Sequence, residues 1–257
     1  MANPLVNELK GNPPEPTKQS AEEYASTLTD LVTKGAGFGK TVNVGAYKLE
    51  NFKVVTETSS GEVETERELE VQDVYLIMDI DQYPTEQLRK MVVKDMARNW
   101  AGRVVHERDL QDPDYSAPGI WTNKSSAVEG DYKRVSDDSG EWTPDPDAYR
   151  VCLRVDRDIV IPVPWGEFKI EKGGHLAVRE RDVPALAKAL QKVASGKISA
   201  EKALLRTNDK GQIVSVFDVY GMEPDFLDNN YGSVGLKAET SSAMKAVEAA
   251  VADAPKP

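Results

Sequence analysis

Cysteine and histidine are scarce in this chain. Its 257 residues include one cysteine, Cys152, and two histidines, His106 and His175. A single cysteine cannot close an intramolecular disulfide or build a cysteine-based zinc site. The two histidines lie far apart in the sequence, which excludes a His-x-x-x-His metal motif. Because Cys152 lies between Val151 and Leu153 in an expected strand, we interpret it as a buried, unreactive thiol.

Basic residues are fewer than acidic ones, and long apolar segments are missing. The 32 Lys and Arg residues face 43 Asp and Glu residues, which gives a net charge of −11. This balance argues against direct nucleic-acid binding, which needs clustered basic residues, but not against a protein that imitates nucleic acid. No apolar run approaches the ~20 residues of a membrane helix, and no signal peptide is evident. We expect a soluble cytoplasmic protein without membrane contacts.

The order of predicted elements indicates an α+β protein with antiparallel, β-rich halves, a long amphipathic helix and a helical insertion. The expected segments are an extended arm at 1–18, a helix–hairpin–helix region at 19–108, a long loop at 109–148, a β-rich module at 149–235 with a helical insertion at 182–206, and a C-terminal helix and tail at 236–257.

Two helices have distinct sequence signals. Ser20 and Glu23 form a capping box at the start of the first helix, and Gly35 is placed to end it. Pro84 suits the first turn of the second helix. The apolar stripe expected on that second helix consists of Leu88, Met91, Val92, Met96 and Trp100.

A long hairpin is expected between these helices. Two strand-rich runs, 41–56 and 66–80, flank the turn residues Ser59-Ser60-Gly61. Residues 57–73 hold seven acids and one base, and alternation gathers the carboxylates on one face. We expect this acidic face to contact water or a basic partner. The candidate partner-binding carboxylates are Glu62, Glu64, Glu66, Glu68 and Glu70.

Residues 109–148 combine prolines, aspartates and aromatic side chains. Loops of this length are uncommon in compact domains and are often functional. We expect Tyr115, Trp121 and Trp142 to contact a partner. The alternative is an insertion whose aromatic side chains only anchor it to the body of the protein.

Two short motifs invite catalytic hypotheses that their context does not support. Gly35-Ala-Gly-Phe-Gly-Lys-Thr41 lacks the spacing of a phosphate-binding loop, and it follows a helix instead of a strand. Ser199-Ala-Glu-Lys202 matches one motif of serine β-lactam-recognising enzymes, but the two companion motifs are missing. Ser199 is better explained as a helix N-cap.

Asp79 and Asp81 form the remaining candidate site. They follow the apolar strand Val74-Tyr-Leu-Ile-Met, and two carboxylates at a strand end can hold Mg²⁺ or Mn²⁺ on a phosphate substrate. The spacing is similar to that of haloacid-dehalogenase-type phosphatases and some glycosyltransferases, although Tyr83 stands where the phosphatases have Thr or Val. The alternative is that both carboxylates favour the turn before the second helix.

The second half of the chain resembles a module of phage and prophage proteins. The similar stretches are Phe168-Lys-Ile-Glu-Lys-Gly-Gly-His175 and Asp218-Val-Tyr-Gly-Met-Glu-Pro-Asp-Phe-Leu-Asp-Asn-Asn-Tyr231. These modules are named for a Pro-Gly-Asp-Tyr-Ile signature, in place of which this chain has Arg157-Asp158-Ile159-Val160. The resemblance implies a phage or mobile-element origin, with the host cytoplasm or the virion as location, and no activity.

These patterns favour a binding or assembly protein over an enzyme. We expect protein partners or self-association through the arms, the acidic hairpin and the aromatic loop, without a cofactor. One alternative is a Mg- or Mn-dependent enzyme that uses Asp79 and Asp81 on phosphate or nucleotide-sugar substrates. The other is an acidic inhibitor that imitates nucleic acid.

Overall fold

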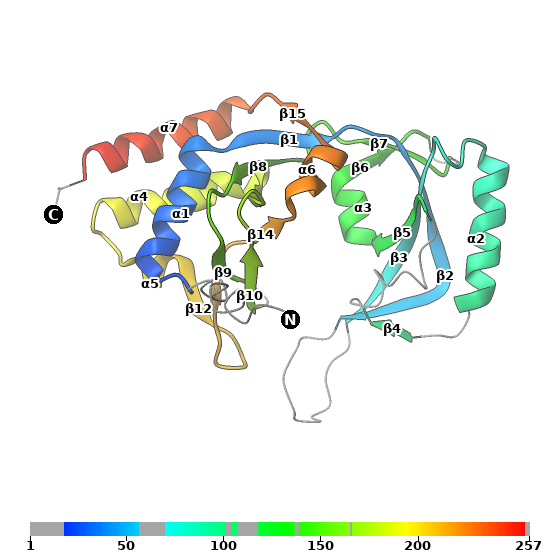
Figure 1. The fold of residues 1–257 in the computed structure, drawn as a ribbon, viewed down its shortest axis with the longest axis horizontal. Coiled ribbons are helices and arrows are strands. Elements are labelled where there is room, and N and C mark those ends of the chain that lie inside the picture. Colours follow the sequence, from blue (N-terminus) through cyan, green and yellow to red (C-terminus); the bar gives the residue numbers. More distant parts are fainter. Residues whose placement is uncertain are drawn as a thin grey trace, which may run out of the picture.

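The computed structural model describes residues 18–56, 70–100, 104–106, 118–136, 139–164 and 166–254. It shows an α+β fold with two larger sheets, each covered by helices (Figure 1). The strand pairings are antiparallel, apart from that of β4 with β2. In the described part of the chain, no helix is both long and apolar enough to cross a membrane.

The first sheet, called the central sheet below, lies in the middle of Figure 1. Its five strands follow the order β14-β11-β8-β1-β15. In that order they span Val219–Met222, His175–Arg179, Tyr149–Arg154, Ala36–Lys40 and Tyr231–Val234. One face of this sheet packs against a layer of helices, with Val151 and Val178 fully buried in the shared core. The other face carries most of the polar side chains discussed below.

The helical layer consists of α1 (Ala21–Lys34), α4 (Val183–Ala194), α5 (Ala200–Leu204) and α7 (Ala238–Ala252). The predicted capping box of α1 is present: Glu23 N donates to Ser20 Oγ, and Ser20 N donates to Glu23 Oε2. Ser199 is the N-cap of α5, as predicted, and accepts from Lys202 N at 3.4 Å. Leu28 and Leu31 of α1 are fully buried in the core of this layer.

The second sheet, called the hairpin sheet below, has the order β5-β3-β2-β7-β6, and β4 pairs with β2. These strands span Ile120–Lys124, Glu70–Asp79, Val44–Thr56, Glu141–Pro144, Tyr132–Arg134 and, for β4, Val104–His106. The predicted hairpin is confirmed, since β2 and β3 pair from Val44 opposite Asp79 to Thr56 opposite Glu70. Helix α2 (Glu86–Trp100) packs on one face and α3 (Ser125–Asp131) contacts β3 and β5.

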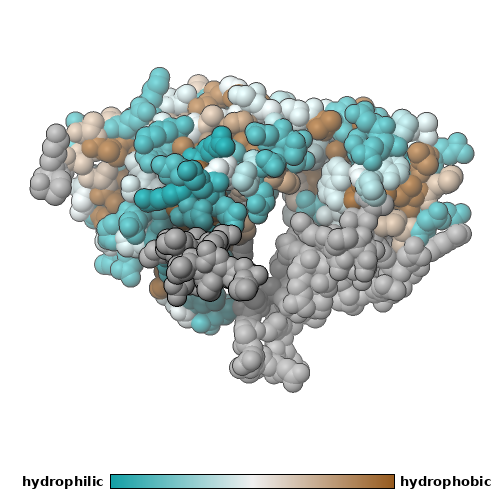
Figure 2. Space-filling view, in the orientation of Figure 1, coloured by the Kyte–Doolittle hydropathy of each residue, from teal (hydrophilic) through white to brown (hydrophobic). Residues whose placement is uncertain are grey.

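Smaller elements complete the fold. Strands β9 (Ile159–Val163) and β10 (Gly166–Ile170) form a hairpin, as do β12 (Leu205–Thr207) and β13 (Ile213–Ser215). The short 3-10 helix η4 (Glu180–Asp182) leads into α4, and α6 (Pro224–Asn230) precedes β15. Apolar residues on the visible surface occur in small groups among hydrophilic ones (Figure 2).

Two expectations differ from the structure. Residues 118–148 were expected within a long loop, but they form β5, α3, β6 and β7 of the hairpin sheet. The glycine-rich stretch after α1 is strand β1, which lies between β8 and β15. Gly37 suits this position because a Cβ there would lie 2.7 Å from the backbone oxygen of Val234. The central sheet therefore combines a strand from the expected 19–108 segment with strands from 149–235.

The amphipathic stripe of α2 also needs a correction. Val92, Val93 and Met96 pack against the hairpin sheet, whereas Met91 is 56% exposed. Arg89 is buried in that interface, where its Nη1 donates to the backbone oxygen of Tyr83 at 2.8 Å. Val92 and Met96 of the predicted stripe thus face the sheet, Met91 does not, and the side chain of Trp100 lies outside the described residues.

Replacing the cap residue of α1 tests this part of the fold. Ser20→Ala removes one acceptor for the Glu23 amide, and we expect it to lower the free energy of unfolding by about 1 kcal/mol. Ser26→Ala, on the exposed face of the same helix, is the matched control and should not lower stability, because alanine is the better helix former. Urea unfolding measures both variants, and equal effects would contradict the capping role.

Candidate binding cleft between the two sheets

Strand alternation gives the central sheet a basic second face. In β8, Val151 and Leu153 point to the helical layer, so Arg150 and Arg154 lie on the opposite face. Arg150 stands opposite Arg179 of β11. Cationic side chains thus share one surface of a protein whose overall charge is −11.

Arg150 is the most buried of these cations, with 6% of the residue exposed. Its Nη2 donates to both carboxylate oxygens of Asp131, at 2.9 and 2.7 Å. Its Nε donates to the hydroxyl oxygen of Tyr220. Asp131 is the last residue of α3, and a carboxylate at a helix C-terminus is disfavoured by the helix dipole. The guanidinium of Arg150 offsets that cost and joins the two sheets.

Two further cations lie near the same carboxylate. Arg179 Nη1 is 3.8 Å from Asp131 Oδ1, which is an ion pair but too long for a hydrogen bond. Lys40 Nζ lies over the ring of Tyr231, 4.2 Å from its centroid, and Arg150 lies 5.1 Å from the same ring. Burial, followed by the neighbouring charge of Arg150, lowers the pKa of Lys40 to about 8. Positive charge is therefore in excess around Asp131.

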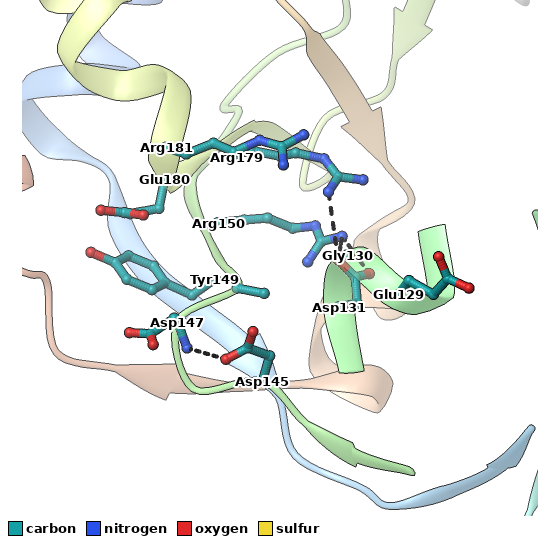
Figure 3. Close-up of a pocket in the computed structure, with 11 residues that line it drawn as sticks. Glu129, Gly130, Asp131, Asp145, Asp147, Tyr149, Arg150, Arg179, Glu180 and Arg181 are labelled. Atoms are coloured by element: carbon teal, nitrogen blue, oxygen red, sulfur yellow. Dashed lines mark hydrogen bonds and ion pairs between the residues drawn. The ribbon is translucent and has the colours of Figure 1, made fainter. Parts of the chain in front are cut away.

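A cleft of about 270 Å³ opens beside this cluster, and we call it the junction cleft. Arg150, Arg179 and Arg181 line it together with five carboxylates, among them Glu129 of α3 and Glu180 of η4. Figure 3 shows the arginine side chains on one side, and Asp145 and Asp147 on the other. Both sheets contribute, because α3 and the connection from β7 to β8 form one wall and β8 and β11 the other.

Lysines already neutralise part of the acidic wall. Lys133 Nζ is 2.8 Å from Asp145 Oδ1, and Lys237 Nζ is 3.2 Å from Asp147 Oδ1. Burial alone would raise the pKa of Asp145, but hydrogen bonds from Lys133 and the Asp147 amide hold it below its ordinary value. Glu180 Oε1 accepts a hydrogen bond from Thr240 Oγ1 at 2.7 Å. The wall is thus a network of internal pairs.

The predicted metal ligands lie elsewhere, in the turn that follows β3. Asp79 Oδ1 accepts from Asp81 N at 2.9 Å, and Asp79 Oδ2 accepts from Gln82 Nε2 at 3.1 Å. These contacts are those of a carboxylate that organises the turn before α2. Among the described residues, no group of three or more His, Cys, Asp or Glu side chains is arranged to hold a metal ion. The metal hypothesis stays a prediction.

Only some of the predicted partner-binding residues lie in the described part of the chain. Glu62, Glu64, Glu66, Glu68 and Tyr115 lie outside the described residues, and Glu70 begins β3.

Trp121 and Trp142 lie on the hairpin sheet in opposite environments. Trp121 of β5 is 38% exposed, and its contact role stays a prediction. Trp142 is buried: its indole N–H donates to the backbone oxygen of Ala46 at 3.1 Å, and its ring meets Tyr75 edge to face. Trp142 is therefore a core residue instead of a surface contact, because its indole completes the packing between β7 and β2.

Cys152 is buried, and burial raises the pKa of its thiol to about 12. It is thus a protonated thiol at neutral pH, in agreement with the interpretation of an unreactive group. His175 is also buried, and its pKa is lowered, chiefly by burial. Neither residue lines the junction cleft.

Sequence reasoning missed Arg150 and Arg179, although a signal was present. Each stands in an expected strand next to apolar residues that face the opposite side, as in Tyr149-Arg150-Val151. A charged side chain at such a position indicates a polar face that needs a partner. The partner, Asp131, could not be inferred because it ends α3, a helix that packs on the other sheet.

Searches against protein-family models, curated proteins and solved structures gave no match. The resemblance to phage modules therefore stays a prediction, and the function has to be argued from the cleft itself.

Lys40 provides a pH test of the cluster. Its folded pKa of about 8 lies below the ordinary 10.5, so between these values the unfolded chain binds more protons than the folded one. The free energy of unfolding should therefore gain from this group as pH rises from 8 towards 10.5. Lys40→Met should lose that gain. Urea unfolding of both proteins at the two ends of this range measures it, and parallel pH profiles would contradict the assignment.

Proposed function

We propose that this chain is a binding protein whose junction cleft recognises an anionic group, a carboxylate or a phosphate, on its ligand or partner. The observation that carries this proposal is the pair Arg179 and Arg181. Both line the cleft, and neither makes a hydrogen bond to a carboxylate among the described residues. Guanidinium groups with free N–H donors are the usual ligands of carboxylates and phosphates in proteins.

The position of the cleft supports the same conclusion. Ligand sites often lie between packed units, where two walls can supply different groups. Here one wall supplies arginines, and the other supplies carboxylates that Lys133 and Lys237 partly neutralise. A small anion can reach the arginines, whereas a long polyanion would meet the carboxylates of Asp145 and Asp147. The cleft therefore favours a compact anionic group over a nucleic-acid backbone.

Calorimetric titration of the full chain with inorganic pyrophosphate and, separately, with succinate tests this proposal. We expect measurable binding of at least one probe, and the two arms distinguish phosphate from carboxylate recognition. Arg179→Gln and Arg181→Gln should each weaken binding about tenfold, since a hydrogen bond to a charged group contributes about 1.5–3 kcal/mol. Arg206→Gln, an exposed arginine of β12 outside the cleft, is the matched control. The same affinity in all four proteins would argue against the cleft.

Self-association through β5 is a second candidate, favoured by Trp121. Strand β5 is the last in the described order of the hairpin sheet, and its Trp121 is 38% exposed. An outer strand with an exposed aromatic side chain can pair with a second copy of the chain. This would satisfy the assembly role that the sequence predicts.

Sedimentation velocity over a range of protein concentrations tests self-association. We expect a dimer whose dissociation constant rises at least fivefold in Trp121→Thr, because threonine preserves the strand but removes the aromatic contact. Val135→Thr changes another exposed apolar side chain and should have little effect. A parent protein that stays monomeric at every concentration would refute the candidate.

A further inference from the structure

Asp131 reaches the basic face of the central sheet from α3, the helix that packs on the hairpin sheet. It ends α3, yet only 8% of the residue is exposed, and both of its oxygens accept from Arg150. The same carboxylate lies 3.8 Å from Arg179, which lines the cleft beside it. The carboxylate of Asp131 thus already occupies the Arg150 guanidinium, which is the group that an anionic ligand would bind.

Charge in this cluster is not balanced by Asp131 alone. Arg150 and Arg179 both pair with it, while Lys40 and Arg150 share the ring of Tyr231, and Arg150 also donates to the neutral hydroxyl of Tyr220. Arg150 is buried and Lys40 and Arg179 are half-buried, so their charges are only partly screened by water and attract a further anion. An anion that enters the cleft can bind Arg179 and Arg181 first, and then approach Arg150.

We propose that Asp131 is a built-in competitor of the ligand: it holds Arg150, and an anionic group that enters the junction cleft displaces it. This inference rests on the proposed function of the cleft. Two carboxylate-like groups cannot share one guanidinium face without repulsion, so binding of the ligand and the Asp131–Arg150 contact oppose each other. Because such coupling is reciprocal, weakening the internal contact must strengthen ligand binding.

Displacement of Asp131 would also loosen the contact between the two sheets. The described ion pairs that join α3 to the central sheet are those of Asp131 with Arg150 and Arg179. The connection from β7 to β8 keeps its own pair between Asp147 and Lys237. Occupation of the cleft should therefore move α3 away from β8 without separating the sheets fully.

Asp131→Asn in the full chain tests the competition. Asparagine keeps the size and one acceptor for Arg150 but removes the charge, so we expect pyrophosphate or succinate to bind at least tenfold more tightly. Asp145→Asn removes the same charge from the wall that also carries Asp131, but at a position without a contact to Arg150, and should tighten binding less than threefold. Equal gains in both variants would show a general charge effect and overturn the inference.

A second measurement does not depend on the folding of Asp131→Asn. Spin labels on Ser126→Cys in α3 and Lys192→Cys in α4, both exposed positions, report the distance between the two sheets. We expect saturating pyrophosphate or succinate, whichever binds, to lengthen or broaden this distance. An unchanged distance despite measured binding would overturn the inference and leave the proposed function standing. If neither probe binds the parent chain, the proposed function fails, and the inference with it.

Discussion

The contact between Arg150 and Asp131 is the interaction on which the arrangement of this molecule depends. Burying a guanidinium without a partner is costly, and removing one member of a buried ion pair leaves the other uncompensated. Arg150 cannot turn to the helical side of the central sheet, because Val151 and Tyr149 occupy that side. Its N–H donors must therefore find an acceptor on the second face of the sheet, and Asp131 supplies it. The hairpin sheet is thereby held where α3 ends.

Local features of the fold could be predicted from the sequence because short-range interactions decide them. The capping box of Ser20 and Glu23 involves residues three positions apart, and the structure contains both of its hydrogen bonds. The long hairpin follows from alternation and a turn signal. The pairing of β1 with β8 and β15 could not be predicted, because a glycine-rich strand shows no apolar alternation. Its glycines serve the close approach of neighbouring strands instead.

In the candidate site, too, local features could be predicted from the sequence and long-range contacts could not. Alternation in β8 and β11 marks Arg150 and Arg179 as members of one sheet face, but their partner depends on how the two sheets meet. Trp142 illustrates the opposite error. Prolines and aspartates around it suggested a loop, yet a tryptophan whose N–H finds the oxygen of Ala46 is a suitable core residue. Composition alone does not distinguish an anchoring aromatic side chain from a binding one.

The place of β1 in the central sheet has a consequence for biosynthesis. β1 lies between β8 and β15, two strands that leave the ribosome long after it. Sheets built from such distant pairings fold slowly, since loop-closure entropy is lost before the contacts form. During translation both edges of β1 lack a partner strand. The core under α1 cannot be completed until β15 has emerged. The nascent chain therefore carries this strand unpaired until most of the sequence has been translated.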